Sequence, residues 1–416
     1  MDGNGGEYFS LDDFDLTDKT VLLRIDINSP LDPESGRILD DYRIRSHLET
    51  IKELSDSKLI IVAHQSRPGN EDFTTMEPHS DRISQLLRKR VEYVDGLFDK
   101  NVLNKIRNMW EGEILLLENA RFYAEETYLK GVKDWEKQKK THIVQNLAPE
   151  IDYHVHDAFA AAHRAQPTLV GFSEVVPSLA GRVMEKELKN LGKVFTLEEK
   201  PKIAFLGGMK AEDSITISRH MLERGDIDKI LTGGVVANIF LMADGNELGE
   251  GNRKFLKDEF DDHESLVEEA REVLERWPEK IELPVDVVLN QEGERNGKPL
   301  DELPSEYPVF DIGLDTIMKY KKIIENSALT VVNGPAGAFE MEGFAIGTNE
   351  IFRSVAQSDA YTIIGGGHST AVLENLGISE SIDHVSTGGG SCINFLAGRD
   401  LAGVQALRRS YETFGD

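Results

Sequence analysis

Short, continuously apolar runs recur along the chain and are separated by stretches with helical periodicity. Runs such as "KLIIVA", "EILLLE" and "ALTVVNG" do not alternate apolar and polar residues, as a strand with one solvent-facing side would. A continuous run is typical of a parallel strand that helices cover on both faces. The alternation therefore predicts an α/β fold of doubly wound, Rossmann-like parallel sheets, with ligands at the carboxyl ends of the strands.

A length of 416 residues is more than one hydrophobic core usually serves, so two lobes are expected. At the middle of the chain, Pro177 precedes "SLAGRVMEKELKNLGKV", which has the periodicity of a long amphipathic helix. We predict a helix over 178–195 that joins an N-terminal lobe, 1–177, to a C-terminal lobe, 196–399.

Two other stretches carry local predictions. The segment "DDYRIRSHLETIKEL" predicts one helix with an apolar face, capped by Asp40 or Asp41. The segment "NQEGERNGKPLDELP" is polar and rich in turn residues, so it predicts a loop.

The formal net charge of -27 narrows the class of protein. It argues against a sequence-independent nucleic-acid binder, which needs a basic surface. No apolar run reaches the ~20 residues of a membrane helix, and the N-terminal residues lack a signal peptide's pattern. A single cysteine, Cys392, excludes an intrachain disulfide and favours a cytoplasmic protein. The acidity favours a halophilic protein adapted to concentrated salt, although ordinary solubility is an alternative explanation.

Basic and polar residues gather at the predicted strand ends of the first half. "RIDINSP", "HQSRP", "ENARF" and "AAAHRAQP" each follow or end an apolar run, and an arginine opens the helix after the first of them. Strand ends of a parallel sheet meet at one edge. Arginine binds two oxygens of a phosphate or carboxylate at once. The pattern predicts an anion site formed by Asp26, Asn28, Arg43, His64, Arg67, Arg121, His163 and Arg164.

The strand ends of the second half are rich in glycine instead. They read "FLGGMK", "LTGG", "NGPAGAFE", "IGGGHST" and "HVSTGGGS". Glycine lets backbone amides and helix N-termini approach phosphate closely. None of these loops matches the P-loop pattern or the dinucleotide fingerprint. The pattern predicts a nucleotide site of another type.

These motifs, in this order, resemble the phosphoglycerate kinase family over nearly the whole chain. "RIDINSP", "HQSRPG", "LLENARF", "DAFAAAHRAQPTLVGF", "VNGPAGAFE" and "IIGGGHST" all have counterparts there, and "ENARFYAEE" and "GGGHST" are most similar to archaeal members. The resemblance implies reversible phosphoryl transfer between ATP and the carboxylate of 3-phosphoglycerate, by closure of two lobes about a hinge. It also implies that residues 400–416 pack back on the N-terminal lobe.

The resemblance assigns roles to individual residues. In the anion site, the residues that bind 3-phosphoglycerate are Asp26, Asn28, Arg43, His64, Arg67, Arg121 and Arg164. The catalytic residues are Arg43, Lys210, Gly366 and Gly367. The nucleotide, with Mg²⁺, binds to Gly207, Gly208, Lys210, Ser214, Gly313, Asn333, Pro335, Glu340, Gly365, Gly366, Gly367, His368 and Ser369.

Two positions depart from the bacterial and eukaryotic pattern of the family. Ser214 stands where those members have a second lysine, and His368 stands where they have an aspartate near the metal. Imidazole is a poor ligand for Mg²⁺, so the protein ligand of the metal stays unknown. We expect a monomer. The alternatives are a nucleotide-dependent dehydrogenase and a phosphate-ligand sensor or scaffold that has the fold without turnover.

Overall fold

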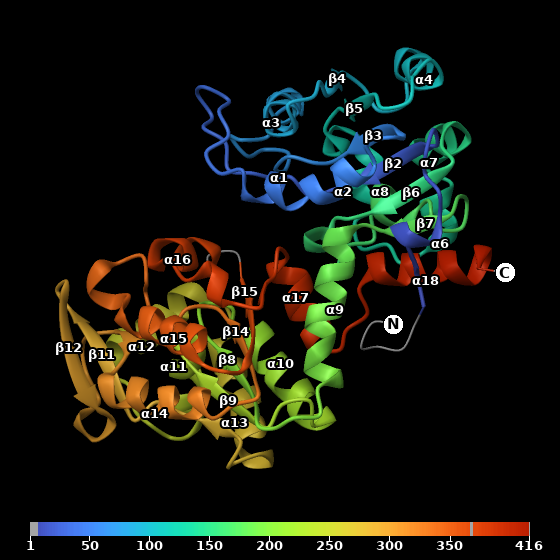
Figure 1. Cartoon of the computed structure of the whole chain (residues 1–416). Helices are drawn as coiled ribbons and strands as arrows, with labels where there is room; N and C mark the ends of the chain where they lie inside the picture. Colours follow the sequence, from blue (N-terminus) through green and yellow to red (C-terminus); the bar gives the residue numbers. More distant parts are fainter. Residues whose placement is uncertain (1–6, 367–368, 416) are drawn as a thin grey trace. The chain divides into compact units, whose positions relative to one another are not determined.

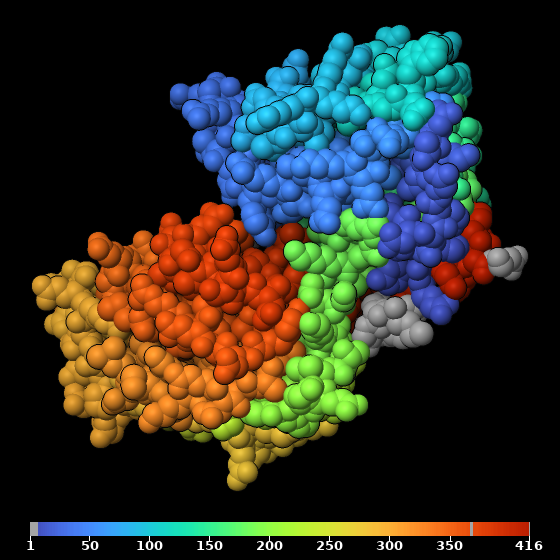
Figure 2. All heavy atoms as spheres, in the orientation of Figure 1, coloured from blue at the N-terminus to red at the C-terminus, as the bar shows by residue number. Residues whose placement is uncertain are grey.

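The computed structural model describes residues 7–366 and 369–415. The chain divides into two compact units (Figures 1 and 2). Unit 1 comprises Met1–Gly192 together with Asp400–Asp416, and unit 2 comprises Lys193–Arg399.

Unit 1 is built on a parallel sheet with the strand order β1-β7-β6-β2-β3-β5-β4 among the residues described. Its strands are β1 (Phe9–Ser10), β2 (Thr20–Arg24), β3 (Lys58–Val62), β4 (Glu92–Val94), β5 (Ile114–Leu117), β6 (Tyr153–His156) and β7 (Ser178–Ala180).

Both faces of this sheet are covered, which explains the continuous apolar runs. Val21 and Leu23 of β2 belong to one core cluster, while Leu22 between them belongs to another. Ile61 and Ile60 of β3 divide in the same way. Successive side chains of a strand point to opposite faces, so the central positions of these strands are all apolar. The α/β prediction is confirmed.

Helices α1 to α9 follow in chain order, and the C-terminal helix α18 returns to unit 1 from the far end of the sequence. In Figures 1 and 2, red α18 lies against the blue N-terminal residues, and it contacts β1, β7 and α8. The helices are α1 (Tyr42–Ser46), α2 (Leu48–Glu53), α3 (Glu77–Leu87), α4 (Lys100–Arg107), α5 (Ala124–Tyr128), α6 (Trp135–Lys139), α7 (His142–Leu147), α8 (Pro167–Val170), α9 (Arg182–Thr196) and α18 (Ala402–Phe414).

Two helix predictions in unit 1 need correction. The helix predicted over 178–195 begins only at Arg182, because Ser178–Ala180 form strand β7 between β6 and β1. The helix predicted after Asp40 is interrupted at His47, which separates α1 from α2. Asp41 stands before α1 but makes no capping bond, since its carboxylate binds Arg45 and Arg82 instead.

Unit 2 contains a second parallel sheet, with the order β10-β9-β8-β14-β15-β16 within the described part of the chain. Its strands are β8 (Lys202–Leu206), β9 (Lys229–Thr232), β10 (Ile281–Glu282), β14 (Leu329–Asn333), β15 (Tyr361–Gly365) and β16 (His384–Val385). A small antiparallel sheet, β12-β11-β13, is formed by β11 (Asp286–Gln291), β12 (Glu294–Pro299) and β13 (Val309–Ile312).

The β11–β12 hairpin corrects a further prediction, since residues 290–304 had the composition of a loop. Strand β12 pairs with β11 over its whole length although most of its side chains are at least partly exposed. The helices of unit 2 are α10 (Ala211–Arg224), α11 (Gly234–Ala243), α12 (Glu250–Glu259), α13 (His263–Arg276), α14 (Leu314–Glu325), α15 (Ile346–Gln357), α16 (Ser369–Leu376) and α17 (Gly389–Leu396). No helix in the described ranges is long and apolar enough to span a membrane.

Candidate active site

The anion site predicted in unit 1 lies at the carboxyl edge of its sheet. Strands β6, β2, β3 and β5 are consecutive neighbours in parallel register. The loops that leave them carry, in the same order, Arg164, Asp26 with Asn28, His64 with Arg67, and Arg121. Neighbouring parallel strands end at one edge, so four separate sequence motifs converge there.

Arg43 joins the same site from α1. Its Nη1 donates to Oδ1 of Asp26 at 3.0 Å, and its side chain retains 34% of its exposure, whereas that of Asp26 retains 6%. Burial opposes ionisation of Asp26, but the charges of Arg43 and Arg24 outweigh it and hold the pKa of this carboxyl below its usual value. Arg43 is therefore a half-exposed cation held by a buried carboxylate.

Behind the site, a buried arginine fixes the ring of His64. Arg24 is fully buried, and it donates to Thr168 Oγ1 at 2.9 Å and to His64 Nδ1 at 3.0 Å. Guanidinium is only a donor, so Nδ1 of His64 accepts and the ring proton lies on Nε2. Burial, with the charge of Arg24, lowers the pKa of His64 well below its usual value. His64 is thus a neutral hydrogen-bond donor.

The loop between His64 and Arg67 has one unusual backbone conformation. Ser66 has φ of 55°, in the left-handed region that side chains other than glycine rarely adopt. Its N–H donates to Asn28 Oδ1 at 2.7 Å, and its carbonyl accepts from Nη1 of Arg121. These two predicted site residues therefore hold the strained turn that leaves Arg67 exposed.

Positive charges crowd the rest of the site. Burial, followed by the charges of Arg164 and Arg24, lowers the pKa of Arg121 to about 10. Burial also lowers the pKa of Arg164, whose Nε donates to His163 at 3.1 Å. Cations held close together against their own repulsion need an anion to neutralise them.

Sequence reasoning missed one more cation near this site. Lys130, two residues beyond α5, has a pKa that is lowered by burial and then by the charges of Arg164, Arg67 and Arg121. It follows no strand directly, so the rule that located the other residues could not find it.

The glycine-rich strand ends of unit 2 approach one another very closely. A Cβ added to Gly207 would lie 2.2 Å from the carbonyl oxygen of Pro335, and one on Gly334 would lie 2.4 Å from that of Gly207. The Gly207 N–H donates to Asn333 O, and the Gly208 N–H donates to Pro335 O. The loops after β8 and β14 are thus bonded backbone to backbone with no room for side chains.

Helix N-termini follow these strand ends. Lys210 is the N-cap residue of α10 and Gly233 is that of α11, and neither makes a side-chain capping bond. Free N–H groups at a helix start attract phosphate. The start of α14, after Gly313, differs because Asp286 accepts from Asp315 N and Thr316 N and so places a carboxylate there.

The other residues predicted to bind nucleotide are distributed as follows. Asn333, Gly365 and Ser369 are buried, and Ser369 Oγ donates to Gly365 O at 2.9 Å. Gly366 has φ of 110°. Pro335 and Glu340 are more accessible. Gly367 and His368 lie outside the described residues.

Ser214 is the one predicted contact whose position makes binding difficult. It is fully buried in α10, and its Oγ has no partner in the described part of the chain. A buried hydroxyl cannot reach a phosphate unless the helix moves.

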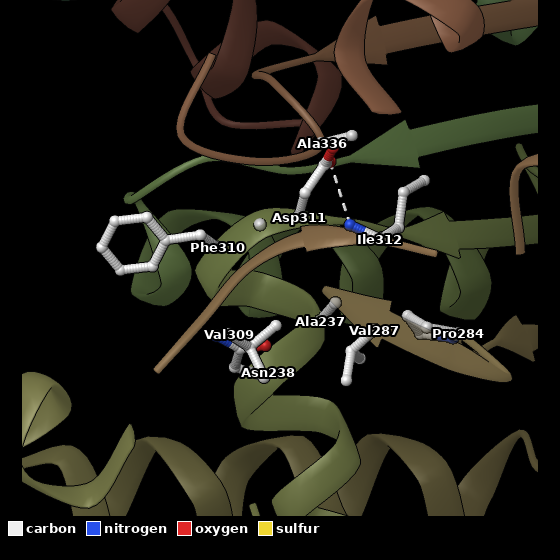
Figure 3. Close-up of a pocket in the computed structure, with 10 residues that line it drawn as sticks. Ala237, Asn238, Pro284, Val287, Val309, Phe310, Asp311, Ile312 and Ala336 are labelled. Atoms are coloured by element: carbon white, nitrogen blue, oxygen red, sulfur yellow. Dashed lines mark hydrogen bonds between the residues drawn. The ribbon is translucent and has the colours of Figure 1, made fainter. Parts of the chain in front are cut away.

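A narrow pocket in unit 2 opens beside the glycine loops (Figure 3). Its apolar walls come from Val287, Val309 and Ile312, and Asn238 of α11 adds an amide. Asp311 at its rim is fixed by bonds from Gly347 N and Arg295 Nη1, both at 2.9 Å. Its free space holds about one water molecule, which is too small for a nucleotide base, and it includes residues of α11 and β13 that sequence reasoning did not select.

No group of three or more His, Cys, Asp or Glu side chains positioned to hold a metal occurs within residues 7–366 and 369–415. The described donors therefore do not form a cage for Mg²⁺. A magnesium ion held mainly by phosphate oxygens and water is compatible with that donor set.

Comparison with known proteins gives one consistent result. A family model described as phosphoglycerate kinase matches residues 11–399. A phosphoglycerate kinase of Methanothermus fervidus is 47% identical over 406 residues, covering 97% of this chain and 98% of that protein. A phosphoglycerate kinase of Methanococcus maripaludis is 48% identical, covering 97% and 99% of the two chains. The crystal structure of phosphoglycerate kinase from Pyrococcus horikoshii superposes with a TM-score of 0.90 at 42% identity, covering 98% and 100% of the chains.

Proposed function

The chain belongs to the phosphoglycerate kinase family and transfers a phosphoryl group reversibly between ATP and 3-phosphoglycerate, and we propose which of its residues carry that reaction. The products are ADP and 1,3-bisphosphoglycerate. The family and activity predicted from the sequence are confirmed. The alternatives, a dehydrogenase or a non-catalytic sensor, are not favoured.

In this proposal, 3-phosphoglycerate binds to unit 1. Its phosphate and carboxylate are held by Arg67, Arg121 and Arg164, with His64 donating through Nε2 and Asn28 and Asp26 completing the site. The observation that carries this assignment is the Arg43–Asp26 pair beside that cluster, because it combines a partly exposed cation with a buried carboxylate that orients it.

ATP binds to unit 2 in this proposal. The N-terminus of α10 with Lys210, the amides after β8 and β15, and the loop through Asn333 and Pro335 receive the phosphates. The adenosine binds beside Gly313 and Glu340. The uncapped starts of α10 and α11 support this arrangement.

Transfer joins the carboxylate oxygen of 3-phosphoglycerate to the γ-phosphorus of ATP, while the bond from that phosphorus to the β,γ-bridging oxygen breaks and ADP leaves. The attacking carboxylate is already ionised, so no general base is needed. The protein has to align the two substrates, exclude water and neutralise the moving group. We assign the neutralising charge to Arg43 and Lys210, aided by amides of Gly366 and Gly367. The lobes then have to close, because each binds one substrate.

The remaining assignments are proposals of the same kind. Mg²⁺ enters with the nucleotide and lowers the negative charge of its phosphates. The protein is a cytoplasmic, halophilic monomer that binds no nucleic acid. The net charge of -27 supports the salt adaptation.

Arg67 offers a clean test, since it is exposed and its removal disturbs no packing. Arg67→Ala should weaken 3-phosphoglycerate binding about tenfold or more, as expected for one charged hydrogen-bonding partner. ATP binding and the unfolding temperature should not change. Arg90→Ala, which removes a surface arginine of the same lobe, is the matched control. Unaltered affinity of Arg67→Ala in calorimetric titration would remove Arg67 from the site.

A further inference from the structure

His47 lies at the break between α1 and α2 and is 2% exposed. Its position was not selected by any sequence motif. The apolar spacing of Ile44, Leu48 and Ile51 continues through it as if one helix were present. The two ring nitrogens make hydrogen bonds in different directions. One bond reaches the acceptor site, and the other reaches the start of α9.

On one side, the ring contacts the acceptor site. His47 Nε2 lies 3.2 Å from both the backbone N and the backbone O of Asp26. The side chain of Asp26 is the group that holds Arg43. His47 therefore fixes the backbone of the residue that orients the proposed catalytic arginine.

On the other side, the ring contacts the residue that caps α9. His47 Nδ1 donates to Asp157 Oδ2 at 2.7 Å. The second oxygen of Asp157, Oδ1, accepts from Val183 N at 2.8 Å and from Met184 N at 3.2 Å. Asp157 thus satisfies two free N–H groups in the first turn of α9 and places a negative charge at the positive end of the helix.

A second contact links the same segment with α9 independently. Thr50 Oγ1 of α2 accepts from Arg182 N at 3.1 Å, and the Arg182 guanidinium donates to Glu53 at the end of α2. The α1–α2 segment therefore carries Arg43 near one end and holds the first turn of α9 near the other. Helix α9 itself runs from unit 1 into unit 2.

We propose that His47 is a positioning residue that couples occupancy of the acceptor site to the first turn of α9. Binding of 3-phosphoglycerate restricts the motion of Arg43 and Asp26. Through the ring of His47, this restriction also reaches Asp157 and the Val183 and Met184 amides that Asp157 binds. The coupling is a difference in free energy between two sites, so it works equally in the reverse direction. This inference rests on the proposed binding of 3-phosphoglycerate to unit 1.

The test measures amide hydrogen exchange at Val183 and Met184 with and without saturating 3-phosphoglycerate. In the wild type, the ligand should slow this exchange about fivefold or more, a typical coupling between sites. The discriminating variant is His47→Asn, whose amide stands in for Nδ1 and keeps the bond to Asp157 but cannot reach Asp26. Its exchange without ligand should match the wild type, while the effect of the ligand should disappear.

His47→Gln, whose amide stands in for Nε2, should keep the contact to Asp26 and also lose the coupling. His142→Ala removes an exposed histidine of the same lobe and should behave as the wild type. In His47→Asn, kcat should fall about ten- to a hundredfold, as for a misplaced catalytic group. Affinity for 3-phosphoglycerate should fall much less, because Arg67, Arg121 and Arg164 remain.

Two outcomes would overturn the proposal. One is a wild type whose α9 amides do not respond although calorimetry on the same sample shows that 3-phosphoglycerate binds. The other is a His47→Asn protein that keeps the full response and full kcat, which would leave His47 a packing residue. Failure of the wild type to bind 3-phosphoglycerate at all would instead contradict the proposed function.

Discussion

The two units prepare for negatively charged ligands by different physical means. Unit 1 uses side chains: guanidinium groups around His64 and Asp26, with a fully buried arginine behind them. Unit 2 uses its backbone, with glycine loops bonded to one another and helix N-termini that lack a side-chain cap. Unit 1 thus offers an anion positively charged side chains, whereas unit 2 lets it come close to backbone N–H groups.

The difference determines what each unit tolerates. A charged cluster is sensitive to pH, to salt and to the loss of a single cation, but additional atoms at its rim are easily accommodated. A site built mainly from backbone amides depends less on titrating groups, but it has no room for an added methyl group. The contrast predicts opposite sensitivities in the two units, and the following experiments test it.

The largest effect should come from Arg43. Arg43→Ala should lower turnover by about 10³–10⁵, or roughly 4–7 kcal/mol, because an arginine that meets charge in a phosphoryl transition state is worth that much. ATP binding should change little, but the unfolding temperature should fall, because removal of Arg43 leaves the buried Asp26 carboxylate without the cation that binds it. Steady-state kinetics at saturating substrates measures the effect.

The neighbouring Arg45 supplies the control for that experiment. It is exposed and pairs with Asp41, so Arg45→Ala should keep its activity. Arg43→Lys should recover only part of the rate, because an ammonium lacks the planar fork. If Arg43→Ala kept more than about a tenth of the wild-type turnover, Arg43 would stabilise the transition state by less than ~1.4 kcal/mol. The catalytic assignment of Arg43 would then be wrong.

Acid should unfold unit 1 before unit 2. Burial lowers the pKa of His154 to about 3, that of His79 to about 4 and that of His163 to about 4. Burial also lowers the pKa values of His64 and His156 well below their usual value. Between these values and the unfolded pKa near 6.5, the unfolded chain binds more protons, so stability falls as the pH falls. Each histidine contributes up to about 1.4 kcal/mol per pH unit.

Tryptophan fluorescence can separate the two units in the acid titration. Trp110 and Trp135 belong to unit 1 and Trp277 belongs to unit 2, so Trp277→Phe reports unit 1 and the double variant Trp110→Phe/Trp135→Phe reports unit 2. The transition of unit 1 should lie at higher pH. Coincident transitions, or an earlier loss of unit 2, would contradict the contrast in titrating groups.

Gly207→Ala tests the backbone cradle of unit 2. Its Cβ would lie 2.2 Å from a carbonyl oxygen, so the β8 and β14 loops have to separate, at about 1–3 kcal/mol for an overpacked site. Nucleotide affinity should fall with stability, while 3-phosphoglycerate binding is retained. Gly297→Ala, which meets no atom within 4 Å, is the matched control. Equal thermal unfolding of both variants would mean that the loops yield freely.

Salt should have the smallest effect and provides the baseline for the others. With a net charge of -27, self-repulsion is screened as the Debye length falls from ~10 Å at 0.1 M to ~3 Å at 1 M. The unfolding temperature should therefore rise between these KCl concentrations. Binding of 3-phosphoglycerate should weaken over the same range more than nucleotide binding does, because guanidinium contacts are screened. A midpoint that KCl leaves unchanged or lowers would argue against salt adaptation.

Sequence alone predicted the parts of this molecule that repeat a simple rule. The strands of the parallel sheet in unit 1 all end at the same edge, so Asp26, His64, Arg121 and Arg164 could be grouped although they are far apart along the chain. The topology of the sheet determines where the polar residue that follows a buried strand lies, and the hydrophobic pattern of the sequence indicates that topology.

The rest depends on tertiary contacts that leave no periodic signal. His47 interrupts a helical pattern because its ring bonds with Asp157, which lies 110 residues away. Strand β12 forms in a polar segment because β11 pairs with it, not because its own residues favour burial. Lys130 reaches the cationic cluster from a turn, and Arg24 supports His64 from inside the core.

The return of α18 to unit 1 has a consequence for how the chain is made. Gly403 N donates to Ala162 O, and Ser410 Oγ accepts from Ser178 N beside β7. Residues 400–416 leave the ribosome only after all of unit 2, which is complete at Arg399. The lobe that is translated first is therefore the lobe that is finished last. During synthesis the edge at β7 therefore lacks its covering helix until the end of the chain has been made.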